Sequence, residues 1–161
     1  MPSLYPAPNE HDVEAILGGL ATAATHVARA QSAEPDREPT GVILEYVTED
    51  DSLAAIAFAD HDVVNFMGGA IAAVEAATIQ ETNSGSKLHD AAVESFREVA
   101  SGLGSGLNGD YTPALHLANV HQLPGELSEE IKQLWRKPRG KRAYRVTVDD
   151  YGSGTLILYL N

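Results

Sequence analysis

The side chains with the clearest chemical pattern lie on one face of a helix predicted over residues 87–107. At 3.6 residues per turn, the opposite face of that helix is apolar, which predicts packing against a core. The polar face presents carboxylates and hydroxyls at spacings of four, three and four, from Glu94, Glu98, Ser101 and Ser105. Ordered acids and hydroxyls on an outer face indicate a binding or catalytic surface. The alternative interpretation is an ordinary solvated face.

The composition limits the classes of function. A chain of 161 residues with 43% hydrophobic residues predicts one globular domain. The chain has no cysteine, which excludes disulfides and thiolate metal sites. A formal charge of −12 argues against a nucleic-acid partner. The sequence has neither an apolar run of about 18 residues nor a leader pattern, so we expect a soluble, cytoplasmic protein without a membrane partner.

Basic residues are concentrated near the end of the chain. Seven of the eleven Lys and Arg residues lie within 132–145, a segment that contains no acid. A basic segment on an acidic protein can dock an acidic partner, and Arg139, Lys141 and Arg142 are the candidate contacts. The alternative is a solvated loop that turns at Pro138 and Gly140.

Other patterns do not indicate a cofactor or metal bound by this chain. Residues 104–109 match G-x-G-x-x-G, but they end a predicted helix and precede a strand, the reverse of a dinucleotide site. His116 and His121 are predicted on opposite faces of a strand, which excludes one shared metal. The adjacent Asp60, His61 and Asp62 are better explained by a helix cap.

The elements that must position the polar face follow from periodicity. We expect a helix over 10–31 capped by Asn9, a linker over 32–39, a hairpin over 41–59, a helix over 61–77 and a connection over 78–86. After the helix over 87–107 we expect a strand over 113–121, a helix over 124–135 and a hairpin over 143–161. This order predicts an α+β fold with a mostly antiparallel sheet and helices on one face. An edge strand in the last hairpin would favour a homodimer.

The same elements resemble a known family. The segments that carry the likeness are AVESFREVASGLGSGL, TPALHL with Gln-Leu-Pro downstream, and YRVTVDDYGSGTLILYL. Together with the hairpin-to-helix order, they resemble the CheC/CheX group of chemotaxis phosphatases, with related domains in flagellar switch proteins. The resemblance covers residues 40–161, and residues 1–39 form an N-terminal lead-in, helix and linker of the same domain.

The resemblance implies a site on the helix over 87–107. Family enzymes carry Glu-x-x-Asn there and dephosphorylate the aspartyl phosphate of a response regulator. The amide positions the attacking water, the acid contacts the regulator, and the regulator supplies Mg²⁺. Glu98 matches the acid, whereas Ser101 stands in the amide position. A serine hydroxyl is shorter than an amide and has one donor, which predicts weakened catalysis.

Two functions therefore remain open from the sequence. The first is a CheX-like protein that binds a phosphorylated receiver domain, with weak or no phosphatase activity. The second is a non-enzymatic scaffold or switch-like interaction module, which the missing amide and the basic segment favour.

Overall fold

The computed structural model describes residues 5, 7–21, 23–30, 40–107 and 114–161, and it contains an antiparallel sheet of six strands. In sheet order these are β1 (Thr25–Ala30), β5 (Gly140–Val148), β6 (Gly152–Leu160), β3 (Leu53–Asp60), β2 (Gly41–Thr48) and β4 (Leu115–Leu123). The helices are α1 (Glu10–Gly18), α2 (His61–Ile71), α3 (Ala76–Ser84), α4 (Asp90–Leu107) and α5 (Glu129–Arg136). The predicted α+β class is confirmed.

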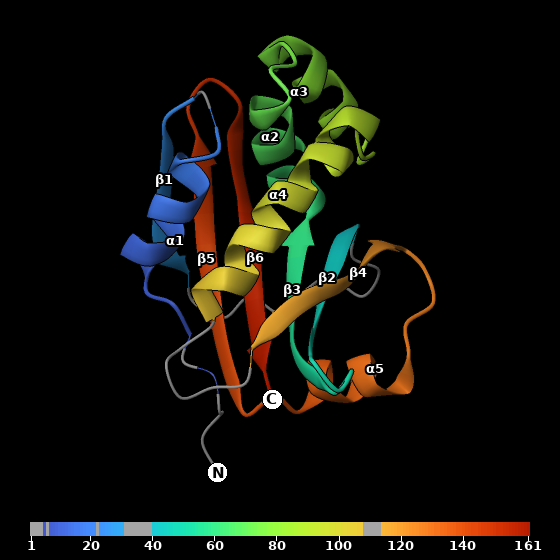
Figure 1. Cartoon of the computed structure of the whole chain (residues 1–161). Coiled ribbons are helices and arrows are strands. Elements are labelled where there is room, and N and C mark those ends of the chain that lie inside the picture. The colour runs from blue at the N-terminus through green and yellow to red at the C-terminus, as the bar shows by residue number, and fades with distance from the viewer. Residues whose placement is uncertain (1–4, 6, 22, 31–39, 108–113) are drawn as a thin grey trace.

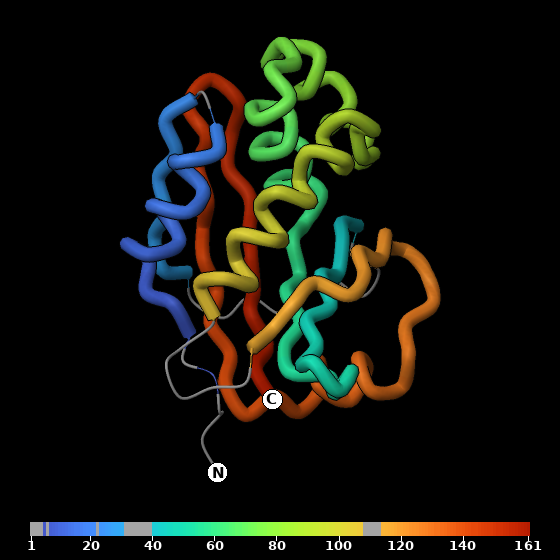
Figure 2. The backbone as a smooth tube through the Cα atoms, in the orientation of Figure 1, coloured from blue at the N-terminus to red at the C-terminus, as the bar shows by residue number. Residues whose placement is uncertain are grey.

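The helices form a layer over one face of the sheet (Figure 1). The larger core lies between this face and the apolar sides of α1, α2 and α4. Figure 2 shows α4 crossing the sheet obliquely, between α1 and the α2–α3 pair. No helix in the described ranges is both long and apolar enough to cross a membrane.

Helix α5 is the exception to the one-sided arrangement. Its buried Ile131 and Leu134 belong to a second core on the opposite face of the sheet. Trp135 packs there against the rings of Phe58 and Tyr159, with centroids 5.6 and 5.9 Å apart. The helix begins at Glu129 rather than at the predicted residue 124, because the Ser128 hydroxyl caps it by accepting a hydrogen bond from the Ile131 N–H.

The order helix, strand, hairpin occurs twice in the chain. The first half is α1-β1-β2-β3, and the second is α4-β4-β5-β6 with α5 inserted after β4. The strand order mirrors this repetition, because β1 and β4 lie at the two edges while β6 and β3 pair at the centre. The two halves of the chain therefore occupy equivalent positions in the sheet.

The predicted helix over 10–31 is wrong in its second half. Helix α1 ends at Gly18, and Thr25–Ala30 forms β1, which pairs with β5. Gly18 and Gly19 have poor helix propensity and interrupt the pattern. Most residues of β1 are exposed or half-buried, so the strand lacks a clear alternation of apolar and polar residues and can be mistaken for the end of a surface helix. The linker predicted over 32–39 lies outside the described residues.

The connection predicted over 78–86 is also wrong, because residues 76–84 form α3. Only Ile79 of this helix is buried. A single large apolar side chain in nine residues leaves no periodic signal in the sequence.

The terminal hairpin is interior to the sheet. β5 pairs with β1 and β6, and β6 pairs with β5 and β3. The prediction that one of these strands lies at an edge is wrong, and with it the reason given for a homodimer. The actual edges are β1 and β4.

Strand β4 contains a register shift in its pairing with β2, which the strict alternation assumed for His116 and His121 did not include. Glu45 of β2 is paired with Asn119, but the next residue, Tyr46, is paired with Leu117. The extra residue Ala118 shifts the alternation, so that His116 and His121 fall on the same face of the sheet. The prediction of opposite faces is wrong.

Candidate functional site

Helix α4 presents the predicted polar row on its surface. Glu94, Glu98, Ser101 and Ser105 are all exposed. The residues buried on its other side are Ala92, Phe96, Val99, Ala100, Leu103, Gly104 and Leu107. The sequence periodicity therefore places the four polar side chains together on one outer face, here called the α4 face.

The two carboxylates of the α4 face, those of Glu94 and Glu98, have no ion-pair partner among the residues that the structure describes. The Ser105 hydroxyl donates to the Ser101 carbonyl at 3.4 Å, back along its own helix. A free carboxylate one turn from an exposed serine can accept hydrogen bonds from a partner and hold a water molecule.

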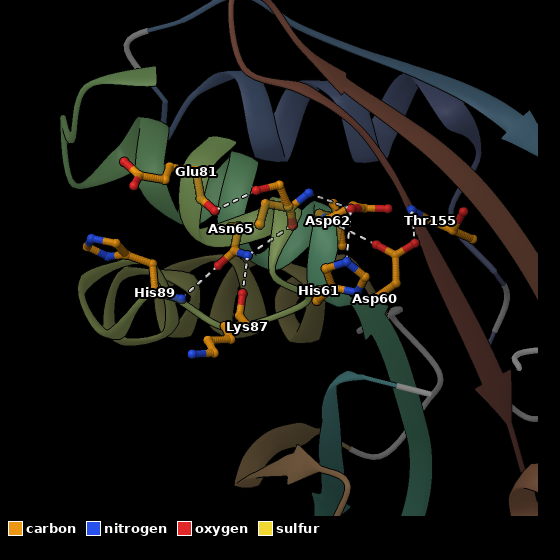
Figure 3. A network of polar contacts seen from close by, with 11 residues as sticks. Asp60, His61, Asp62, Asn65, Glu81, Lys87, His89 and Thr155 are labelled. Atoms are coloured by element: carbon orange, nitrogen blue, oxygen red, sulfur yellow. Dashed lines mark hydrogen bonds and ion pairs between the residues drawn. The ribbon is translucent and has the colours of Figure 1, made fainter. Parts of the chain in front are cut away.

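A buried amide fixes the start of α4 (Figure 3). Asn65 of α2 is fully buried, and its Nδ2 donates to Asn83 Oδ1 at 3.0 Å and to the Lys87 carbonyl at 2.7 Å. Its Oδ1 accepts from the His89 N–H at 2.8 Å. These bonds hold the segment that leads into α4, and so they set where the α4 face begins.

The two helices touch through their backbones next to this amide. A Cβ added at Gly68 of α2 would lie 2.1 Å from the carbonyl oxygen of Ala92 in α4. Only glycine permits this approach, which fixes the orientation of α4 against α2.

The network continues to the start of α2. Asp60 accepts from the Val63 N–H at 2.9 Å, which confirms the predicted cap, and from the Thr155 N–H at 3.0 Å. Burial raises the pKa of Asp60 to about 6, against the lowering effect of these two hydrogen bonds. Asp62 accepts from Asn83 Nδ2 at 2.8 Å and lies 3.3 Å from His61 Nε2.

Asp62 and Asn65 are an acid and an amide at the same spacing of three as the family pair, but Asp62 was considered only as part of a helix cap and Asn65 was not considered. The signal was present in HDVVNFM at the start of α2. However, both donors and the oxygen of Asn65 are occupied inside the protein. This amide therefore stabilises the fold and cannot position a water for a partner.

The three predicted basic contacts do not share one surface. Arg142 donates to the carbonyls of Ala7 and Pro8, at 3.4 and 3.3 Å, on the helix-covered face. Lys141 lies 5.3 Å above the Tyr159 ring on the α5 side. Arg139 is exposed and immediately precedes β5. The alternation of β5 divides the basic segment between the two faces of the sheet.

The glycine pattern at 104–109 is not a phosphate loop. Gly104 and Gly106 lie inside α4, and Gly109 lies outside the described residues. Across the ranges that the structure describes, no three His, Asp or Glu side chains are grouped to hold a metal ion.

No family model matches the sequence, and no curated protein matches it significantly. Solved structures do match. The FliM middle domain from H. pylori has a TM-score of 0.59 at 5% identity, over 94% of this chain and 84% of that chain. FliY from Thermotoga maritima has a TM-score of 0.59 at 9% identity, over 96% and 85%.

A chain of the CheX-CheY-BeF3-Mg²⁺ complex from Borrelia burgdorferi has a TM-score of 0.54 at 10% identity, over 93% of both chains. At these identities the likeness concerns the fold alone. The strand order, the helix layer and these superpositions together show that the chain adopts the CheC/CheX/FliM-type fold.

Proposed function

We propose that this protein binds the receiver domain of a response regulator, favouring the phosphorylated form, through the α4 face. The observation that supports the proposal most directly is the exposure of Glu98 and Ser101, one turn apart, with the Glu98 carboxylate in no ion pair among the described residues. A solved protein of the same fold forms a complex with CheY carrying beryllofluoride and Mg²⁺. In such a complex the receiver supplies the Mg²⁺, and this chain supplies the docking surface.

We expect phosphatase activity to be weak or absent. The Ser101 hydroxyl is attached directly to Cβ, so it reaches less far from α4 than an asparagine amide does. It also offers one donor where an amide offers two. A misplacement of about 1 Å in a positioning group can reduce a rate about 100-fold. The protein would then bind the phosphorylated receiver and release it largely unchanged.

Binding is tested by calorimetry against receiver domains encoded in the same genome, with and without beryllofluoride. We expect tighter binding with beryllofluoride and at least about fivefold weaker binding for Glu98→Ala, the effect of losing one central contact. Glu81→Ala is the matched control, because Glu81 is an exposed acid of α3 outside the α4 face. Absence of binding to every receiver would refute the proposal.

Catalysis is tested separately by following loss of phosphate from the receiver. Wild type should be slow, and Ser101→Asn should raise the rate by up to about 100-fold. Glu98→Ala in the Ser101→Asn background should remove the gain. A fast wild type that Glu98→Ala inactivates would show that serine positions the water adequately.

The second candidate is a non-enzymatic switch-like interaction module. FliM and FliY superpose on this chain with TM-scores of 0.59, beside 0.54 for the CheX-complex chain, so the fold is equally compatible with this candidate. Its test uses Arg139→Glu, because Arg139 is exposed whereas Arg142 anchors the N-terminal segment. Partner binding lost in Arg139→Glu and retained in Glu98→Ala would favour the module over the receiver-binding protein.

A further inference from the structure

The second half of α4 carries Ser101 and Ser105 but has a weak helical sequence. Gly102, Gly104 and Gly106 all lie in this half. Glycine is the poorest helix former apart from proline, because it loses the most backbone freedom. The half-helix over 101–107 therefore depends on tertiary contacts more than the half over 90–99 does.

One such contact is a hydrogen bond from the sheet. Tyr46 of β2 is fully buried, and its hydroxyl donates to the Ala100 carbonyl at 2.6 Å. Ala100 immediately precedes Ser101. Burial raises the pKa of Tyr46, so the phenol stays protonated and remains a donor.

The Tyr46 ring supports the same turn by packing. A Cβ added at Gly104 would lie 3.0 Å from Cε1 of this ring. On the neighbouring side, Ile16 of α1 lies against Gly102 and Gly106, where added Cβ atoms would meet it at 2.8 and 2.9 Å. The half-helix over 101–107 therefore packs between Tyr46 of β2 and Ile16 of α1.

We propose that Tyr46 is a positioning residue for the α4 face, because its hydroxyl holds the turn that places Ser101 beside Glu98. A partner that contacts both side chains requires that turn to be helical. The effect on receiver binding rests on the proposed function, but the effect on α4 can be measured on the protein alone.

The test is Tyr46→Phe, which keeps the ring and removes the hydroxyl. Hydrogen exchange of the 101–107 amides should rise about fivefold, the factor for a hydrogen bond of typical net strength, while the 90–99 amides change less. Binding to a beryllofluoride-loaded receiver should weaken by a similar factor.

Tyr144→Phe is the matched control. Tyr144 is also buried, and its hydroxyl also donates to a backbone carbonyl, that of Pro8 in the N-terminal segment. The control should leave exchange over 101–107 and receiver binding unchanged, although it also removes one buried hydrogen bond.

A rescue variant separates positioning from general destabilisation. Gly106→Ala raises helix propensity in the same half, and its Cβ would meet only the Cδ1 end of Ile16. Added to Tyr46→Phe, it should restore protection over 101–107 and recover binding. Unchanged exchange there, or an equal rise throughout the sheet and helices, would overturn the proposal. If exchange behaves as expected but wild type binds no receiver, only the proposed function fails.

Discussion

Helices α1 and α4 open the two similar halves of the fold, yet their acids have different roles. In α1, Glu14 is followed three residues later by Leu17. The Glu14 carboxylate accepts the Val27 N–H at 2.9 Å, and Leu17 is 1% exposed. In α4, Glu98 and Ser101 have the same spacing and are both exposed.

The difference follows from what each helix adjoins. Strand β1 is an edge strand, and its unpaired backbone groups need partners or cover. Glu14 supplies an acceptor to one of them, which also hinders another strand from pairing there. Helix α4 crosses the sheet obliquely (Figure 1), its apolar side is buried, and its outer row is exposed. A glutamate at the same helical spacing is therefore structural in one half and available to a partner in the other.

The largest expected difference in stability is between an asparagine introduced into α1 and one introduced at the equivalent position of α4. Leu17→Asn puts an amide into the core and should lower the free energy of unfolding by about 2–5 kcal/mol. Ser101→Asn adds an amide at the surface and should change it by less than about 0.5 kcal/mol. Urea denaturation of both variants measures this difference. Equal losses would contradict the contrast between the two helices.

The buried acid Asp60 should make stability depend on pH, unlike an exposed acid. Its pKa is about 6 in the folded protein against 3.8 for an ordinary aspartate, so the folded state binds the proton more tightly. The associated stabilisation is complete below about pH 3.8 and is lost as the pH rises through about 6, by up to about 3 kcal/mol.

Denaturation midpoints measured from pH 4 to 7 test this dependence. The Asp60→Asn variant should have a flatter profile than wild type, even if losing one acceptor from the cap lowers its stability at every pH. The exposed-acid variant Glu81→Gln should retain the wild-type profile. A wild-type slope that survives in Asp60→Asn would assign the pH dependence to another group.

The smallest expected effect is the difference in stability between alanine variants of Glu14 and Glu98. Glu14→Ala removes the acceptor of the Val27 N–H and should cost about 1 kcal/mol, whereas Glu98→Ala should cost less than about 0.5 kcal/mol. Glu14→Gln keeps an acceptor oxygen and should recover most of the loss. Faster exchange of the Val27 amide in Glu14→Ala would locate the effect at β1.

Local patterns were sufficient for much of the fold. The two-faced α4, the β2–β3 and β5–β6 hairpins, and the caps at Asn9 and Asp60 were predicted because each depends on residues close in sequence. Strand β1 and helix α3 were missed because an edge strand and a surface helix bury few side chains. Their sequences therefore have weak apolar patterns, which led to β1 being predicted as part of a helix and α3 as a connection.

The candidate site was predicted only in part. The periodicity of α4 was enough to place Glu98 and Ser101 on an outer face. The basic segment could not be judged in the same way, because its division between two faces depends on the register of β5. The buried role of Asn65 depends on carbonyls and N–H groups of residues 83–89, which no local pattern connects to α2.

The sequence by itself determined which side of α4 faces water and that a serine stands three residues after Glu98. Both follow from 3.6 residues per turn and residue type. Only the tertiary structure decided that Glu14 is occupied, that the last hairpin is interior, and that Tyr46 holds α4 from 54 residues away. Periodicity reports which side of an element is buried, whereas strand neighbours and long-range hydrogen bonds depend on how the chain is routed through the sheet.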